Sequence, residues 1–188
     1  MSKLILIKHS LPEINPNIPA SQWHLSELGR RRSELLADKL NEYALDVIMS
    51  SVEPKASETA QIMAHRLHKP FEIAEGLHEH ERNRVPFGTV EQFEKSVADF
   101  FVRPSELVFG EETADAARNR FSNAIARVIE KFPRQTIAIV AHGTVITLYV
   151  SCLANLEPFI FWKRLGLPSM IVLSLPDLQV EEIVENIL

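Results

Sequence analysis

The sequence has a single cysteine and no long hydrophobic run, and each absence excludes a class of protein. Cys152 stands alone among 188 residues, so an internal disulfide is impossible. No apolar stretch approaches the roughly 20 residues that a membrane-spanning helix requires. The first apolar run, Leu4–Ile7, follows Lys3 and is too short for the core of a secretory signal peptide. We therefore expect a cytoplasmic protein with no membrane partner.

Basic residues are also in short supply. Lys and Arg number 20 against 25 Asp and Glu, which gives a formal net charge of -5. Proteins that bind nucleic acid need a basic excess to neutralise phosphates, so no nucleic-acid partner is expected. A hydrophobic share of 46% with 24% charged residues is typical of a globular protein. The length suits one domain, residues 1–188, and we find no internal repeat.

Short apolar runs alternate with segments of helical periodicity along most of the chain. Strands are expected at residues 4–7, 46–49, 71–74, 136–141, 170–175 and 179–184, and helices after Ser26, from Pro54, and near 90–101, 113–132 and 144–156. Apolar runs rich in β-branched residues are typical of buried parallel strands. Because strands and helices alternate, we predict an α/β fold, a three-layer α/β/α sandwich around a mainly parallel sheet.

Some side chains have an expected place on these helices. Ser26 suits a helix N-cap, and Thr89 with Gln92 fits a capping box. The apolar positions that keep helical spacing are Leu28, Leu35, Leu36, Leu40 and Tyr43 of one helix and Val90, Phe93, Val97, Phe100 and Phe101 of another. Such a stripe normally faces the core. Cys152 falls at an apolar helical position, so a packed thiol is expected there.

Two histidines stand where buried strands end. Lys8-His9-Ser10 follows the first strand, and His142-Gly143 follows the strand 136–141 and leads directly into a helical pattern. Open α/β folds bind ligands, anions especially, at the carboxyl ends of strands and beside the amino ends of helices. We therefore expect the two imidazoles to share one site.

The stretch from about 75 to 111 interrupts the alternation of strands and helices. It carries His78, Glu79, His80 and Arg82 ahead of a short helix. Segments of this kind often carry binding residues, and we interpret it as an insertion that covers the site. His78 and His80 alternate on an extended segment, but they lack a third ligand at fixed spacing, so no metal site is expected.

Five motifs occur in order along the chain: Lys8-His9-Ser10, Leu25-Ser26-Glu27-Leu28-Gly29, residues 50–60, Leu77-His78-Glu79 and Ala141-His142-Gly143. Together they resemble the histidine phosphatase superfamily, the phosphoglycerate mutase-like proteins, across nearly the whole chain. The family pattern is Arg-His-Gly, Leu-Thr-Glu-Leu-Gly, Ser-Ser-Pro-Leu-x-Arg-Ala-x-Gln-Thr-Ala, Leu-x-Glu and His-Gly. The third motif is long and specific.

The resemblance implies a catalytic set. His9 is the expected nucleophile, which forms a transient phosphohistidine, and His142 is expected to donate to the phosphoryl oxygens. Glu79 takes the place of the general acid. Lys8 and Lys55 occupy the positions of the two phosphate-binding arginines. No metal and no other cofactor is expected, because cationic side chains stabilise the charge of the phosphoryl group.

Two further expectations concern the insertion. A carboxyl group acts as an acid only if its pKa is raised, and the phosphate with the neighbouring Glu81 is expected to do this for Glu79. His80 or Arg82 is expected to reach the substrate. The family often has Gly-Glu-Ser followed by an arginine. Arg120 fits that pattern if Glu112-Thr113 is the match, but Gly110-Glu111 gives a competing register, so these residues are not included in the catalytic set.

The chain departs from the family at Lys8, Lys55 and Ser10. Lysine keeps the positive charge but loses the planar fork that grips two phosphate oxygens at once. Ser10 adds a side chain beside the nucleophile. The leading prediction is a phosphohydrolase for a small phosphomonoester or a phosphorylated side chain. A weakly active or inactive phospholigand-binding protein and a phosphomutase are the alternatives, and the sequence carries no signal for the oligomeric state.

Overall fold

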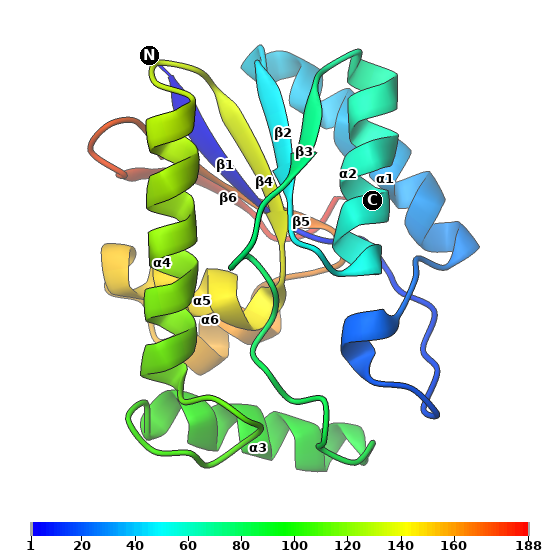
Figure 1. Ribbon diagram of the computed structural model, residues 1–188, viewed down its shortest axis with the longest axis vertical. Coiled ribbons are helices and arrows are strands. Elements are labelled where there is room, and N and C mark those ends of the chain that lie inside the picture. Colours follow the sequence, from blue (N-terminus) through cyan, green and yellow to red (C-terminus); the bar gives the residue numbers. More distant parts are fainter. Residues whose placement is uncertain (1, 188) are drawn as a thin grey trace.

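The central sheet has six strands in the order β3-β2-β4-β1-β5-β6. The computed structural model describes residues 2–187. The strands are β1 Lys3–Lys8, β2 Val47–Ser50, β3 Phe71–Ile73, β4 Ile137–Ala141, β5 Ser169–Ser174 and β6 Val180–Val184. β1, β4, β2 and β3 are parallel, whereas β5 is antiparallel to β1 and to β6. The predicted α/β fold with a mainly parallel sheet is confirmed (Figure 1).

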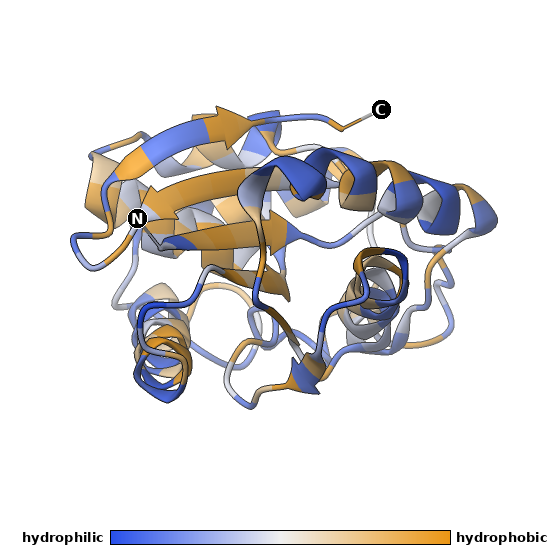
Figure 2. Cartoon of the chain, turned by 90° about the horizontal axis from the view of Figure 1, so that it is seen from above, coloured by the Kyte–Doolittle hydropathy of each residue, from blue (hydrophilic) through white to orange (hydrophobic). Residues whose placement is uncertain are grey.

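Helices cover both faces of this sheet. They are α1 Glu27–Leu40, α2 Pro54–Leu67, α3 Val90–Val102, α4 Ala114–Lys131, α5 Gly143–Ala154 and α6 Pro158–Arg164, with short 3-10 turns at Ala20–Gln22 and Asn41–Tyr43. Leu4 and Leu6 pack with α4 and α5, whereas Ile5 and Ile7 pack with α1 and α2. Figure 2 shows the apolar strands enclosed between helices that carry many hydrophilic residues. Successive strand residues alternate between two cores, so three layers form.

Residues 75–111 leave the sheet after β3 and carry α3. Figure 1 shows α3 beyond the carboxyl ends of β1 and β4. Val97 and Phe100 on its inner face are fully buried, so the helix is packed onto the core. The predicted capping box is confirmed, because the Thr89 and Gln92 side chains each accept a hydrogen bond from the other's backbone N–H. The role of this segment as a cover stays a prediction.

The buried face of α1 differs from the predicted one. Leu36 and Leu40 are buried as expected, but Leu28 and Leu35 are 49% and 47% exposed. The buried stripe consists of Gly29, Ser33, Leu36, Ala37 and Leu40. Three of these five residues are small, because α1 packs closely against its neighbours. Leu28 and Leu35 each lie one position off the stripe.

Two more apolar residues were placed wrongly by the sequence pattern. Val90 is 74% exposed, because it is the first residue of α3 and precedes the turn that reaches the core. Cys152 is exposed, whereas a packed thiol was expected. The residues of α5 are buried from Gly143 to Ser151, so the last turn of that helix, with Cys152, emerges from the core.

Gly29 lies where α1 begins against the loop that follows β1. The hydroxyl of Ser26 accepts from the backbone N–H of Gly29 at 3.0 Å and donates to the carbonyl of Leu11 at 3.0 Å. A Cβ atom at position 29 would lie 2.0 Å from that same Leu11 oxygen. Only glycine permits this approach, which fixes the start of α1 beside the loop that carries His9.

We expect Gly29→Ala to lower the free energy of unfolding by about 1–3 kcal/mol, the usual cost of overpacking. At an exposed helix position, replacing glycine with alanine would raise the free energy of unfolding by roughly 1 kcal/mol. The sign of the change therefore tests whether Gly29 is in close contact. Urea unfolding measures the difference. Arg31→Ala on the exposed face of α1 is the control and should change little. A Gly29→Ala variant as stable as the wild type would show that the contact with Leu11 is looser than described.

Candidate active site

His9 and His142 lie side by side at the carboxyl ends of β1 and β4. The strand register pairs Lys8 with Ala141, and the backbone N–H of His9 donates to the Ala141 carbonyl at 3.0 Å. The ring centroids are 5.2 Å apart, with 61° between the ring planes. His9 is 7% exposed and His142 is 0% exposed. The structure therefore brings the two histidines into one site.

Each ring has one nitrogen engaged by a neighbouring oxygen. Nδ1 of His9 lies 2.7 Å from the carbonyl oxygen of Ser10. Because a carbonyl only accepts, Nδ1 carries the hydrogen and Nε2 keeps its lone pair. Nε2 of His142 lies 2.8 Å from Oγ of Ser51. Burial, with smaller effects of nearby Lys55, holds the pKa of both histidines well below the ordinary 6.5, so His9 is neutral and has the form that a nucleophile requires.

The carboxylate of Glu79 lies at the amino end of α5. Its Oε2 accepts from the N–H of Thr144 at 3.1 Å, and its Oε1 accepts from Val145 at 3.2 Å and from His80 at 2.9 Å. Unpaired N–H groups and the helix dipole favour an anion at this position. Glu79 thus docks the 75–111 segment onto the helix that begins directly after His142.

The expected rise in the pKa of Glu79 is not found in the structure. Burial acts to raise it, but Arg82, His142 and backbone N–H groups outweigh burial and lower the pKa of Glu79 to about 2. Glu81 was expected to help raise it, yet its carboxylate turns toward His78, with 3.3 Å between Oε1 and Nε2. Glu79 is therefore an anion at neutral pH, and a rise in its pKa caused by phosphate together with Glu81 stays a prediction.

Lys8 is the last residue of β1, and its ammonium group is partly engaged. Nζ donates to the carbonyl oxygen of Leu165 at 2.6 Å, and the side chain lies against Gly143, where a Cβ atom would be 3.1 Å from Cε. Burial lowers the pKa of Lys8 to about 8, although Glu79 acts to raise it. An ammonium has three N–H donors, so two remain for an anion.

Lys55 is paired with a carboxylate that the sequence analysis did not single out. Lys55 is 5% exposed and Glu53 is 6% exposed. Nζ of Lys55 donates to the Ala20 carbonyl at 2.6 Å and forms an ion pair with Oε2 of Glu53. Oε1 of Glu53 accepts from the N–H of Glu79 at 2.8 Å and lies 3.7 Å from Nε2 of His142. Burial lowers the pKa of Lys55, while Glu53 opposes that shift.

Ser10 does not crowd the nucleophile. Its backbone N–H donates to Oγ1 of Thr59 at 3.1 Å, and its hydroxyl donates to the carbonyl of Gly29 at 2.7 Å. Ser10 is fully buried. The side chain of Ser10 therefore ties the loop after β1 to α1, and its backbone N–H ties the same loop to α2.

The two residues expected to reach the substrate have different surroundings. His80 is 2% exposed, and its Nε2 lies 2.7 Å from the carbonyl of Phe109. The guanidinium of Arg82 lies 5.2 Å from the ring centroid of Phe93 and 4.0 Å from Oε2 of Glu79. Arg82 thus lies beside Glu79, whereas His80 is buried against Phe109. Contact of either with a substrate stays a prediction.

An ion pair between α4 and the loop before it holds the Glu79 segment. Arg120 pairs with Glu112, whose Oε1 also accepts from the backbone N–H of Glu81 at 3.0 Å. Thr113 caps α4 by accepting from Ala116, so Glu112-Thr113 is the register in which Arg120 fits. Arg120 donates to the carbonyl oxygens of Gly76, His78 and Glu79 at 2.9, 2.8 and 3.2 Å.

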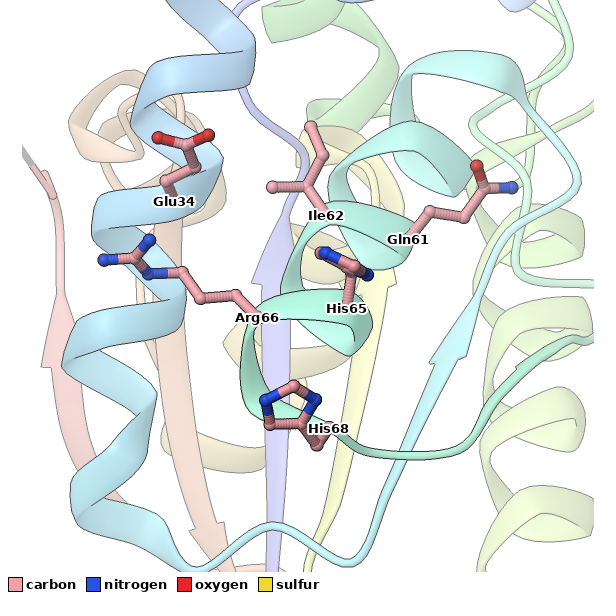
Figure 3. Close-up of a pocket in the computed structure, with 6 residues that line it drawn as sticks. All are labelled: Glu34, Gln61, Ile62, His65, Arg66 and His68. Atoms are coloured by element: carbon pink, nitrogen blue, oxygen red, sulfur yellow. The ribbon is translucent and has the colours of Figure 1, made fainter.

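A cavity of about 370 Å³ opens beside the site, with Glu53, Glu79 and His78 in its wall. A second hollow, of about 510 Å³, lies on the outer surface of α1 and α2 (Figure 3). His65 and His68 border this second hollow and are exposed. None of the predicted site residues lines it, whereas Glu79 and His80 line the smaller cavity. His9 and His142 lie outside the walls of both.

No metal centre is built among residues 2–187, where no group of three or more His, Cys, Asp and Glu side chains is arranged to hold an ion. The His78 ring contacts the Glu81 carboxylate, whereas the His80 ring contacts the Phe109 carbonyl, so the two rings do not share a partner. Over the same described range, no helix has both the length and the apolar character that crossing a membrane requires.

The match to a known family is extensive. The profile of the histidine phosphatase superfamily (branch 1) matches residues 4–179, so the chain belongs to this superfamily. Phosphoserine phosphatase 1 of Hydrogenobacter thermophilus is 27% identical over 172 residues, which cover 87% of this chain and 81% of that protein. The uncharacterized phosphatase PhoE of Bacillus subtilis is 23% identical over 141 residues, which cover 75% of this chain and 70% of that protein.

Solved structures share the fold. Phosphoserine phosphatase from Entamoeba histolytica, in complex with phosphoserine, superposes with a TM-score of 0.79 at 20% identity and covers 98% of this chain and 97% of that chain. Mycobacterial glucosyl-3-phosphoglycerate phosphatase with inorganic phosphate gives a TM-score of 0.78 at 18% identity, with 99% and 98% covered. These likenesses support the fold alone.

The docking of Glu79 onto α5 contributes a pH-dependent part of the stability. Its pKa of about 2 lies below the ordinary 4.5, so the contribution is complete above about pH 5 and is lost as the pH falls toward 2. We expect Glu79→Gln to be less stable than the wild type by on the order of 3 kcal/mol at neutral pH. In urea unfolding, that difference should shrink steadily from about pH 5 to pH 3. A difference that stays constant over this range would rule out the ionised cap.

Proposed function

We propose that the protein is a phosphohydrolase that removes a phosphoryl group from a small phosphomonoester or a phosphorylated side chain through a phosphohistidine at His9. The arrangement of His9 carries the proposal. Its Nδ1 is held by the Ser10 carbonyl, its Nε2 accepts no hydrogen bond from any described residue, and the second histidine stands 5.2 Å away. Phosphatases among the relatives support the same class of reaction.

The reaction has two steps. The lone pair on Nε2 of His9 attacks phosphorus in line with the leaving oxygen, and the phosphorus–oxygen ester bond breaks. The leaving oxygen keeps the electron pair and takes up a proton. Water then attacks the phosphohistidine, which releases inorganic phosphate and restores His9. His142 contacts the phosphoryl oxygens during both steps.

Positive side chains bind the transferred group. Lys8 and Lys55 each have ammonium donors beyond those that the protein uses, and Arg82 adds a third charge beside Glu79. Preorganised cations stabilise the charge on the equatorial phosphoryl oxygens, so we propose a reaction that needs no metal. Arg82, and His80 behind it, are the proposed substrate contacts from the 75–111 segment.

The family resemblance gives Glu79 the role of proton donor to the leaving oxygen. Glu79 lines the smaller cavity, and its carboxylate stands at the amino end of α5. As an anion it has to gain a proton before it can donate one. A bound phosphoryl dianion would favour that protonation, because like charges in one site disfavour ionisation.

A weakly active phospholigand-binding protein is the second candidate, and one observation favours it. The ammonium groups of Lys8 and Lys55 are already bonded to the Leu165 carbonyl and to the Glu53 carboxylate. A phosphate must compete with these acceptors. Turnover of an aryl phosphate separates the two candidates.

We expect His9→Ala to abolish turnover of 4-nitrophenyl phosphate, because His9 is the proposed nucleophile. The wild type, quenched during turnover of a ³²P-labelled substrate, should carry an acid-labile, base-stable phosphoryl group. Chelators should leave the rate unchanged. Cys152→Ser is the matched control, since this exposed thiol has no part in the scheme. Turnover that survives in His9→Ala would point to different chemistry.

Truncation of the two lysines tests how the phosphoryl group is bound. Lys8→Met and Lys55→Met should each lower kcat/KM roughly 10- to 1000-fold, the scale of one or two charge-assisted hydrogen bonds. Lys39→Met on the surface of α1 is the control. If both site variants bind phosphate or vanadate as tightly as the wild type, the lysines do not contact the phosphoryl group and the reaction scheme is incorrect.

A further inference from the structure

The ring of His142 has one nitrogen with a partner and one without. Nε2 lies 2.8 Å from Oγ of Ser51, whereas Nδ1 is buried and has no hydrogen-bond partner within residues 2–187. The proposed reaction needs His142 to donate to a phosphoryl oxygen, and Nδ1 is the ring nitrogen left for that contact. The ring can donate there only if its hydrogen is on Nδ1, so the tautomer decides whether His142 can act.

Ser51 follows β2 directly and lies beside the strand that leads to His142. Its backbone N–H donates to the Val140 carbonyl at 2.9 Å, which continues the parallel pairing of β2 with β4. Ser51 and His142 are both 0% exposed. The ends of two paired strands therefore hold the Ser51 hydroxyl against the His142 ring.

The partners of the Ser51 hydroxyl determine where its hydrogen points. Its oxygen accepts from the backbone N–H of Glu53 at 3.3 Å. Because an N–H group only donates, Nε2 of His142 is the acceptor that the described residues offer to the hydroxyl hydrogen. A hydrogen on Nε2 would leave this buried hydroxyl with two donors and no acceptor, which is unfavourable. Ser51 therefore donates to Nε2.

The remaining hydrogen of the ring then lies on Nδ1. Burial, more than nearby Lys55, holds the pKa of His142 well below 6.5, and a neutral imidazole carries one hydrogen. His142 is the N-cap residue of α5, but its side chain makes no cap hydrogen bond. The N–H groups that an N-cap side chain normally binds are those of Thr144 and Val145, and Glu79 accepts both. Nδ1 is thus a donor that faces no competing backbone N–H at these two positions.

We propose that Ser51 is a positioning residue for the reaction. Its hydroxyl donates to Nε2 of His142 and so keeps the hydrogen of that ring on Nδ1, from which it donates to an oxygen of the phosphoryl group at His9. The inference rests on the proposed phosphohydrolase function. The ring centroids of the two histidines are 5.2 Å apart, a separation that a phosphoryl group on His9 can span with one of its oxygens. Ser51 itself does not touch the substrate.

Glu53 has the opposite effect on the tautomer of His142. Its Oε1 lies 3.7 Å from Nε2 of the ring, which is too far for a hydrogen bond. At that distance the carboxylate still favours a hydrogen on Nε2. Without the Ser51 hydroxyl, we therefore expect the hydrogen to move to Nε2. Nδ1 would then present a lone pair to the phosphoryl oxygen, and the two would repel each other.

The first measurement compares Ser51→Ala with the matched variant Ser33→Ala in turnover of 4-nitrophenyl phosphate. Ser33 on α1 is equally buried, and its hydroxyl donates to the Gly29 carbonyl at 2.8 Å, so the control also removes a buried hydroxyl. Loss of one preorganised donor to a charged transition state typically lowers kcat about 100- to 1000-fold. We expect a loss of that size in Ser51→Ala and little change in Ser33→Ala.

The second measurement identifies the tautomer by ¹⁵N NMR of the imidazole nitrogens at neutral pH. A ring nitrogen that carries a hydrogen and one that carries a lone pair differ widely in chemical shift, and the signals of His142 are those missing from His142→Gln. In the wild type the hydrogen should be on Nδ1, and in Ser51→Ala it should be on Nε2. Ser51→Thr keeps a hydroxyl, so it should keep the wild-type tautomer and most of the activity.

Three results would overturn the inference and leave the proposed function intact. They are an active wild type with the hydrogen on Nε2 of His142, a Ser51→Ala enzyme with the wild-type kcat, and a slow Ser51→Ala enzyme whose hydrogen is still on Nδ1. The first needs no variant, so it decides the matter even if Ser51→Ala does not fold. A wild type without phosphatase activity would instead overturn the proposed function, and the role of Ser51 with it.

Discussion

The parallel pairing of β1 with β4 is the constraint on which the site depends. It sets Lys8 opposite Ala141 and ends in the hydrogen bond from the His9 N–H to the Ala141 carbonyl. Both strands are buried on both faces, so their positions are fixed by close packing against two cores. The residue after each strand is a histidine, and the rings meet at the edge of the sheet where α5 begins.

Around this pair, the protein balances its buried charges internally. Lys55 is paired with Glu53, Arg82 lies near Glu79, and Glu79 is held by the amino end of α5. Buried charges persist only when they are paired or hydrogen-bonded. The compact ammonium of Lys55 fits between the carbonyl of Ala20 and the carboxylate of Glu53, where a planar guanidinium would have to find other acceptors.

The sequence predicted the parts of the fold that periodicity and capping determine. The α/β class, the strands that carry His9 and His142, and the caps at Ser26 and Thr89 are confirmed. The prediction from the sequence was wrong where the exposure of a side chain depends on how its helix packs against the core. Leu28 and Leu35 share the helical period of the core residues, but the close approach at Gly29 rotates the buried stripe away from them.

The site was only partly predictable. Motifs identified His9, His142, Glu79, Lys8 and Lys55, and the structure brings these side chains together. Glu53 was missed, because acidic residues before a helix are usually solvent-exposed caps. The available signal was its spacing, two residues before Lys55. The ionised state of Glu79 was also unpredictable, because its carboxylate accepts from three backbone N–H groups. Those of Thr144 and Val145 are distant in sequence, and that of His80 depends on the local backbone conformation.

The central claim is that the two strand ends form one phosphoryl-transfer site. A crystal structure of the protein grown with orthovanadate tests it most directly, because vanadate adopts the geometry of a phosphoryl group under attack. The account predicts vanadium bonded to Nε2 of His9, with Lys8, Lys55 and His142 at its oxygens. Vanadate bound elsewhere, or a site that stays closed by the pair of Lys55 with Glu53 at saturating vanadate, would contradict it.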